Sequence, residues 1–417
     1  MEEKDFKKVD NITEYVREGI KSGRLTVDKV EKFARVHARQ GTLGEEVITK
    51  MANGLEETKN TVKADEKTGN PGWIVTNPDG EEYIVDDSVF QKKYEIDPEN
   101  AEQYKPKGGP VLSATVDEDI EFNAPWGEPM KIEAGGSLIL SGPEDIYGIQ
   151  KSEFENTYAS TERNKFETLR EAKILLEMLN VIDIAKLGAE IGMEPKEQTL
   201  PNGKVVKSLV WDQENLLKAV NAVRYLSEEG KPVEITGAAP AWLVSALTHT
   251  VHPCPVGIYM PQIGKDVDIP QLAHGEANAE GEVAFKSTDK GDAVLVEYNM
   301  DLPEGITTYD ENNLSKVVVP EIAQGKEVYL SGRGPNYLTV AIAEAYAHTN
   351  SSVSLFQPGV GYTCSITHSR SKRLGDLTKD PLGKEEVKEQ LAAPKEAPTQ
   401  EQSQDRAVES KEGPSID

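Results

Sequence analysis

Cysteine, basic residues, aromatic residues and long apolar runs are all scarce in this chain of 417 residues. The two cysteines, Cys254 and Cys364, are too few for a disulfide framework and too far apart for a paired zinc site, so a reducing, cytoplasmic location is expected. No apolar run approaches the roughly 20 residues that span a bilayer, and the first ten residues, MEEKDFKKVD, contain no apolar signal segment. No membrane partner is therefore expected.

Basic side chains are outnumbered, because 46 Lys and Arg stand against 72 Asp and Glu and give a formal net charge of −26. Binding to duplex nucleic acid needs a basic surface that releases counterions, so this charge argues against duplex DNA or RNA as a partner. A small anionic ligand in a locally positive pocket remains possible, although the overall field repels it at long range. The chain length suggests about two to four domains.

The N-terminal residues 1–60 are predicted to form a helical segment, and Thr26 before Val-Asp-Lys-Val is predicted to start a helix within it. Polar, turn-rich residues 61–71 are predicted to be a linker. His37 is expected to be a packed or surface residue and not a ligand. The predicted helical face contains Val30, Phe33, Ala34 and His37.

Residues 72–160 contain an internal repeat. GWIVTNPDGEEYIVDDSVFQKKYE begins at Gly72 and GSLILSGPEDIYGIQKSEFENTYA begins at Gly136, an offset of 64 residues (136 minus 72). Each copy predicts a strand, a turn, a second strand and a helical turn that ends in tyrosine, so this region is expected to be a small β-rich domain with an aromatic core. Through GPEDIYG, which begins at Gly142, and the later Phe154 and Tyr158, the second copy loosely resembles the PGDYG-type domain family.

A second repeat lies in the C-terminal half. VEITGAAPAWLVSALTHTVHPCPVGIYMPQIG at residues 233–264 corresponds to VYLSGRGPNYLTVAIAEAYAHTNSSVSLFQPGVG at residues 328–361. Short apolar strands alternate with helices, which predicts α/β sheets. The expected fold is therefore an α+β and α/β multidomain protein. Its parts would be a helical connector and first copy at 161–275 (the copy itself at 204–275), a second copy at 283–378, and a disordered tail at 379–417.

The turn in the second copy, Gly332-Arg333-Gly334-Pro335, follows a strand and opens a helix. Backbone N–H groups at a helix N-terminus attract anions, and arginine adds bidentate reach to phosphate, so Gly332, Arg333 and Gly334 are predicted to bind a ligand. In the first copy the turn is Gly237-Ala238-Ala239-Pro240, which lacks the arginine. Gly237 is retained as its candidate ligand residue.

Five of the six histidines lie in the two copies: His249, His252, His274, His348 and His368. His252 and His348 close the first helix of each copy, so the structural interpretation is that they cap helix dipoles. An imidazole pair could instead serve as general acid and base, because imidazole titrates near neutral pH. No acidic residue close in sequence completes a metal triad, so no metal ligands are assigned.

The second copy contains Ser331-Gly332-Arg333-Gly334-Pro335, a helix running into His348, Gln357-Pro358-Gly359-Val360-Gly361 and Thr367-His368-Ser369. Together these segments resemble the small CRISPR-associated ring nuclease family. The resemblance covers about residues 283–378, with a more distant copy at 204–275. It implies a cyclic tetra-adenylate ligand, a manganese-dependent linearisation reaction, phosphate contact by Arg333, and site histidines at His348 and His368. His252 and His274 are the corresponding ligand candidates of the first copy.

The family has Asp-Pro-Arg-Leu-Gly where this chain has Gln357-Pro358-Gly359-Val360-Gly361 and Met260-Pro261-Gln262-Ile263-Gly264. Loss of the aspartate and arginine implies weakened or lost cleavage. The first hypothesis is therefore a sponge or sensor of antiviral defence, in which two copies form an intramolecular pseudo-dimer around a cyclic oligonucleotide. One alternative is an active ring nuclease that uses His348 and His368. The other is an assembly protein that reuses the fold, for which a homo-oligomer is one expected form.

Overall fold

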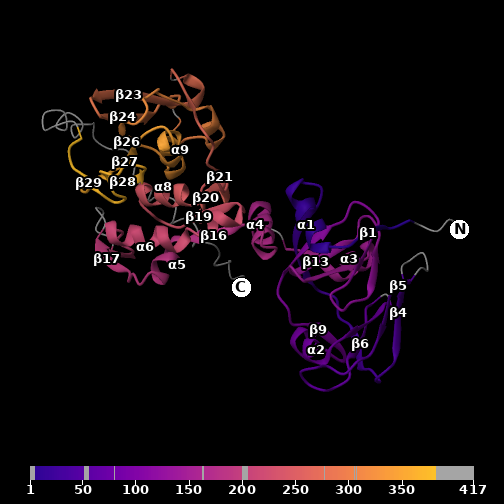
Figure 1. Cartoon of the computed structure of the whole chain (residues 1–417). Coiled ribbons are helices and arrows are strands. Elements are labelled where there is room, and N and C mark those ends of the chain that lie inside the picture. Colours follow the sequence, from indigo (N-terminus) through magenta and orange to yellow (C-terminus); the bar gives the residue numbers. More distant parts are fainter. Residues whose placement is uncertain are drawn as a thin grey trace, which may run out of the picture. The chain divides into compact units, whose positions relative to one another are not determined.

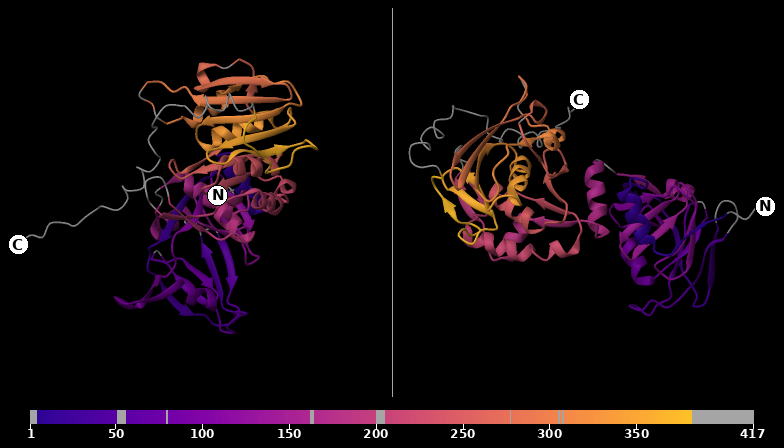
Figure 2. Two further views of the ribbon diagram at one scale, coloured as in Figure 1. Left: turned by 90° about the vertical axis from the view of Figure 1, so that its left-hand side faces the viewer. Right: turned by 45° about the horizontal axis from the view of Figure 1, so that its top comes forward.

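The computed structural model describes residues 5–50, 56–78, 80–161, 164–199, 205–276, 278–304, 306 and 308–381 (Figures 1 and 2). The chain forms two compact units. The first unit contains Met1–Ala239 and Ala246–Pro270, and the second contains Pro240–Ser245 and Gln271–Asp417. Nearly all of the tail predicted at 379–417 lies outside the described residues.

The N-terminal part of the first unit is built mainly of strands. A five-stranded sheet has the order β14-β13-β10-β2-β15, and two three-stranded sheets have the orders β1-β11-β12 and β3-β6-β7. The hairpins β4-β5 and β8-β9 complete this part. The elements are β1 (Lys7–Val9), α1 (Ile12–Lys21), β2 (Thr26–Lys32), β3 (His37–Gln40), β4 (Glu46–Lys50), β5 (Glu56–Thr61), β6 (Trp73–Thr76), β7 (Glu82–Val85), α2 (Asp87–Lys93), β8 (Tyr94–Asp97), β9 (Asn100–Pro106), β10 (Val111–Thr115), β11 (Ile120–Asn123), β12 (Pro129–Ile132), β13 (Ser137–Gly142), β14 (Asp145–Ile149), α3 (Lys151–Thr157) and β15 (Tyr158–Ser160).

The predicted helix from Thr26 to His37 is wrong, because residues 26–32 form the central strand β2. This strand pairs antiparallel with β10 on one side and with β15 on the other, and Val30 is buried between them. The β-branched residues of the segment suit a strand, and ladder bonds on both sides outweigh weak helical periodicity. The predicted linker at 61–71 is a packed turn, in which Val62 and Asp65 are buried.

The repeat in residues 72–160 has the same local structure in both copies. Helices α2 and α3 are seven residues long and start 64 residues apart (151 minus 87), and each leads directly into a strand that begins with tyrosine. The aromatic residues are mainly core, as expected: Phe90 stacks on Trp73 at 4.2 Å between ring centroids. Tyr83 and Tyr94 also accept hydrogen bonds from Lys32 Nζ, at 2.9 and 3.1 Å.

A four-stranded sheet, here called the first sheet, has the order β16-β19-β20-β21. Its first three strands are parallel and the fourth is antiparallel. The sheet begins at Asn180, upstream of residue 204, where the first copy was expected to begin. Strand β18, which starts at Val205, pairs with β17 and does not join this sheet. The elements of this region are α4 (Lys165–Leu175), β16 (Asn180–Asp183), α5 (Ile184–Glu190), β17 (Lys196–Thr199), β18 (Val205–Ser208), α6 (Gln213–Val223), α7 (Leu226–Glu229), β19 (Val233–Thr236), α8 (Ala241–Thr250), β20 (Val256–Met260) and β21 (Lys265–Asp268).

A six-stranded sheet in the second unit, here called the second sheet, has the order β23-β24-β26-β27-β28-β29. Strands β24, β26 and β27 are parallel, and β28 is antiparallel to β27. Helix α9 packs on one face of the sheet (Figure 2), where Tyr298 of β24 meets Thr339 through a 2.6 Å hydroxyl contact. The elements are β22 (Ala273–His274), η1 (Ala279–Gly281), β23 (Val283–Lys290), β24 (Ala293–Met300), η2 (Glu311–Lys316), β25 (Val318–Val319), β26 (Glu327–Arg333), α9 (Asn336–Ala347), β27 (Ser352–Gln357), β28 (Gly361–Thr367) and β29 (Leu377–Thr378).

The protein is thus a mixed α+β structure with many small sheets. The two parallel sheets follow the alternation of strands and helices expected from the sequence. Within the described ranges, no helix is both long and apolar enough to cross a membrane.

Candidate functional site

The glycine–arginine turn, residues 331–335, joins the carboxyl end of β26 to the start of α9. Pro335 occupies the N-cap position with φ −64° and ψ 155°, and its own side chain does not cap the helix. Arg333 is exposed at this end. The turn therefore places a cation beside the positive end of a helix dipole, which is an arrangement that can receive an anion.

The two glycines that flank Arg333 have different structural roles. A Cβ on Gly332 would lie 2.5 Å from the Tyr298 ring and from the Tyr298 carbonyl oxygen, so a side chain cannot fit there. A Cβ on Gly334 would meet only the flexible end of Leu338, at 2.9 Å. Close packing of β26 on β24 is enough to explain Gly332, whereas it does not require Gly334.

Arg333 differs from the arginines of the N-terminal part in its charge partners. Each described arginine up to residue 170 has at least one carboxylate within 4.0 Å: Arg17, Arg24, Arg35, Arg39 and Arg170. The later ones are exposed and form no ion pair or side-chain hydrogen bond with described residues: Arg224, Arg333, Arg370 and Arg373. In so acidic a protein, an exposed arginine without a carboxylate partner is available to an external anion.

Three histidines gather at the other end of α9. His348 is its C-cap residue, and the His348 and His368 rings lie 6.4 Å apart between centroids. His368 Nε2 is 2.9 Å from the Ala347 carbonyl oxygen, and His274 Nε2 is 3.0 Å from that of Ala345. Carbonyl oxygens only accept, so both contacts require a proton on Nε2, and both imidazoles satisfy carbonyls of the last helical turn.

The glycine–arginine turn and the histidines are therefore not neighbours. Helix α9 has 12 residues between Pro335 and His348. At 1.5 Å per residue its ends are about 18 Å apart. A phosphate that contacts the Arg333 backbone cannot also contact the His348 and His368 rings of the same chain.

The first sheet carries the other candidates. Gly237 follows β19 with φ +105°, and a Cβ there would lie 3.1 Å from Ile184 Cβ, so both the backbone and the packing require glycine. His252 follows α8 and is exposed, with its ring 6.5 Å from that of His249. The imidazole pair at the end of α8 resembles the pair at the end of α9. However, His249 and His252 belong to one chain segment, whereas His348 and His368 come from two.

Gln357, which the expected resemblance to ring nucleases aligns with an aspartate, ends strand β27 and accepts a hydrogen bond from a tryptophan. Trp242 Nε1 donates this hydrogen bond to Gln357 Oε1, and the Trp242 side chain is buried. The Gln357 side-chain oxygen is thus uncharged and already bonded. Among the described residues, no group of three or more His, Cys, Asp and Glu side chains could hold a metal ion.

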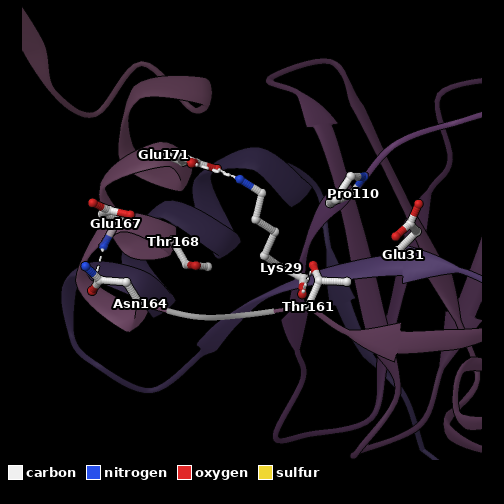
Figure 3. Close-up of a pocket in the computed structure, with 8 residues that line it drawn as sticks. All are labelled: Lys29, Glu31, Pro110, Thr161, Asn164, Glu167, Thr168 and Glu171. Atoms are coloured by element: carbon white, nitrogen blue, oxygen red, sulfur yellow. Dashed lines mark hydrogen bonds and ion pairs between the residues drawn. The ribbon is translucent and has the colours of Figure 1, made fainter. Parts of the chain in front are cut away.

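A cavity of about 390 Å³ lies in the first unit between α4 and β2 (Figure 3). Lys29 forms an ion pair across it with Glu171, at 2.7 Å. The sequence did not indicate this place, and no predicted ligand residue lies there. The lining residues are Lys29, Glu31, Pro110, Thr161, Asn164, Glu167, Thr168 and Glu171.

Sequence reasoning also missed a buried charge network on the first sheet. Glu234 of β19 is fully buried, and Arg170 of α4 binds it. The only signal was a charged residue inside the apolar run Val-Glu-Ile-Thr at 233–236. A carboxylate at a core position indicates a partner, but the sequence does not say which cation supplies it.

Comparison with known protein families gives one match. Residues 303–379 match the family model described as CRISPR-associated protein (Cas_csx3). The matched segment contains the glycine–arginine turn, α9, Gln357, His348 and His368. No curated protein matches the chain. The match supports a CRISPR-related protein and covers less than a fifth of the chain.

Proposed function

We propose that the chain binds a cyclic oligonucleotide of the cyclic oligoadenylate class, as a sponge or sensor with weakened or lost cleavage. The observation that carries this proposal is Arg333, an exposed arginine without a carboxylate partner among described residues, at the start of α9 inside the CRISPR-associated segment. Its guanidinium and the helix N–H groups are donors suited to phosphate oxygens. A cytoplasmic role in antiviral defence belongs to the same proposal.

Weak cleavage follows from the chemistry at Gln357. Hydrolysis or transfer at phosphorus needs charge stabilisation and an oriented nucleophile. Gln357 offers a neutral oxygen that already accepts from Trp242. The arginine of the family string is replaced by Gly359, so its charge is missing as well. Binding can survive these changes because it depends on Arg333 and backbone donors.

The matching strand patterns of the first and second sheets support the pseudo-dimer part of the proposal. Both have three parallel strands followed by an antiparallel strand, with a helix between the second and third. One chain thus carries twice a pattern that a symmetric dimer would supply from two chains. The candidate residues of the first copy are Gly237, His252 and His274.

The test is incubation of the pure protein with cyclic tetra-adenylate, with and without manganese, followed by chromatography of bound ligand and products. Stoichiometric, uncleaved ligand bound to the protein is expected. Arg333→Ala should abolish retention, while Arg373→Ala, which also removes an exposed and unpaired arginine, should leave it unchanged. Equal loss in both variants would indicate general electrostatics, and retention in Arg333→Ala would contradict the proposed contact.

The second candidate function is an active ring nuclease, favoured by the 6.4 Å pairing of His348 and His368. Two close imidazoles could act as acid and base in internal attack by a ribose hydroxyl. Linear product that disappears in His348→Ala would establish this alternative. If neither binding nor product is found, a change in oligomeric state or a protein partner would favour the assembly alternative.

A further inference from the structure

Helix α4 is held on the first sheet by a buried ion pair. Arg170 donates from Nε and Nη2 to the two carboxylate oxygens of Glu234, at 2.6 and 2.5 Å. The Glu234 side chain is 0% exposed, so this bidentate contact is shielded from water. The Arg170 guanidinium also lies 4.7 Å from the ring centroid of Tyr259 on β20, and Tyr259 donates to Glu167 of α4 at 3.3 Å.

A second carboxyl group, that of Asp266 on β21, joins this ion pair. Glu234 pairs with Gly257 and Tyr259 pairs with Asp266 in the strand ladders, so Glu234 and Asp266 lie on the same face. Gly257 between them has no side chain, and a Cβ there would lie 3.2 Å from Asp266 Cβ. Asp266 thus faces Glu234, and Asp266 Oδ1 is buried without a hydrogen-bond partner among described residues.

A hydrogen bond between two carboxyl groups needs a proton on one of them, because two carboxylates are both acceptors. One guanidinium also balances only one negative charge. Burial, and then the hydrogen bond and charge of Glu234, raise the pKa of Asp266 to about 7, although Arg170 and Lys173 oppose the rise. The charged or titratable groups of the elements around Asp266 are Lys165, Glu167, Arg170, Glu171 and Lys173 on α4, Asp183 on β16, Glu234 on β19, Tyr259 on β20, and Lys265 and Asp268 on β21.

The opposite side of α4 packs on the N-terminal sheets, where Ala172 and Leu176 are fully buried in the apolar core. Beside this core, Glu171 forms an ion pair with Lys29 of β2 across the 390 Å³ cavity (Figure 3). Apolar burial therefore holds α4 on the N-terminal sheets. The contact of α4 with the first sheet depends mainly on the Arg170–Glu234–Asp266 network.

We propose that the contact between α4 and the first sheet is a proton-controlled latch, which is docked while Asp266 holds a proton and loosened when that proton leaves. The ionised Asp266 would face Glu234 in a buried site with a single guanidinium between two negative charges, and their repulsion disfavours docking. The latch is a property of the first unit and does not depend on the proposed ligand.

The direction of the pH effect follows from linkage. In the docked state the pKa of Asp266 is above the value of about 4 for a solvated aspartate, so the docked state binds the proton more tightly. The contribution of Asp266 to docking is complete below about pH 4 and falls as pH rises through about 7. Between pH 6 and 8 the opening equilibrium of α4 should increase about tenfold.

The test is amide hydrogen exchange of residues 256–268, the strands β20 and β21 that contact α4, in the full chain at pH 6 and pH 8, corrected for intrinsic exchange rates. The parent should open about tenfold more at pH 8. Asp266→Asn keeps a hydrogen bond to Glu234 without a titrating group, so its opening should not change between the two pH values. Asp268→Asn, on the same strand but exposed, should behave like the parent.

An identical pH response in Asp266→Asn and the parent would overturn the latch. If Asp266→Asn does not fold, the infrared carbonyl stretch of protonated carboxyl groups in the parent decides the matter. A buried protonated carboxyl at pH 6 that is lost at pH 8 is the expected result. Its absence at pH 6 would also overturn the proposal.

Discussion

The first and second sheets share a strand pattern but use one face of the sheet in different ways. On the first sheet, the face that contacts α4 carries the carboxyl groups of Glu234 and Asp266, and Arg170 of α4 is bonded to Glu234. On the second sheet, the face opposite α9 carries Tyr329 and Tyr362, whose rings meet edge to face at 5.5 Å. Buried carboxyl groups need a cation and a proton, whereas buried tyrosines stay neutral, so only the first sheet should respond to neutral pH.

A basic side chain contacts each of these faces. Lys372 is 8% exposed, donates to Tyr329 Oη at 2.8 Å and to Glu327 at 3.0 Å, and lies 4.1 Å from the Tyr329 ring centroid. Glu327 retains 29% exposure, while Glu234 has none. The same kind of contact should therefore be far more costly to break in the first sheet.

The largest expected effect is that of Arg170→Met, which leaves two buried carboxyl groups without their cation. It should lower the free energy of unfolding by about 3–5 kcal/mol. Lys372→Met leaves Glu327 near water and should cost about 1 kcal/mol. Urea unfolding of both variants measures the difference, and equal losses would show that the two networks are energetically alike.

The next effect concerns the glycine–arginine turn. Gly332→Ala places a Cβ against the Tyr298 ring and backbone, so it should cost about 1–3 kcal/mol. Gly334→Ala, where only the end of the Leu338 side chain must move, should cost less than half as much. Thermal unfolding checks the pair, and a larger loss in Gly334→Ala would contradict the assigned packing role of Gly332.

A third prediction concerns Glu327, whose effect on stability should depend on pH in the opposite direction to that of the latch. Burial alone would raise the pKa of Glu327, but hydrogen bonds from Tyr329 and Lys372 outweigh it, and the net pKa is lowered. The Glu327 contribution is therefore present above about pH 4 and lost as pH falls further. Exchange of amides 369–376 should increase between pH 5 and pH 3 in the parent, and Glu327→Gln should remove that pH dependence.

The smallest effect on stability is expected for Arg333→Ala, because Arg333 has no bonded partner among described residues. Its melting temperature should stay within about 1 °C of the parent, in line with surface substitutions elsewhere. A clear loss of stability would show that the turn needs this arginine for structure, and it would weaken the inference that Arg333 is available to a ligand.

Much of the fold could be predicted where local patterns agree with tertiary contacts. The repeat in residues 72–160 retains its spacing in α2 and α3, and the parallel sheets follow the apolar strands and helices of the C-terminal half. The N-terminal strand β2 could not be predicted, since Thr26 and the spacing of Val30 also suit a helix. Pairing with β10 and β15, remote in sequence, decides the matter.

The candidate residues could be named from the sequence, but their grouping into sites could not. The sequence predicts a helix that opens after Arg333 and runs into His348, and the 12 residues of α9 hold these two candidates at opposite ends. The contact of His274 with the Ala345 carbonyl was hidden, because it joins segments 71 residues apart. Both facts depend on where rigid helices place the ends of the chain segments.

By itself, the sequence determined the acidic charge, the internal repeats, the glycine–arginine turn and the neutral side chain of Gln357. Tertiary structure alone decided that Trp242 bonds Gln357, that the imidazoles cap α9, and that Arg170 meets Glu234 beside Asp266. The reason is physical. Composition and local periodicity are encoded residue by residue, whereas burial and charge pairing depend on which distant segments share a low-dielectric interior.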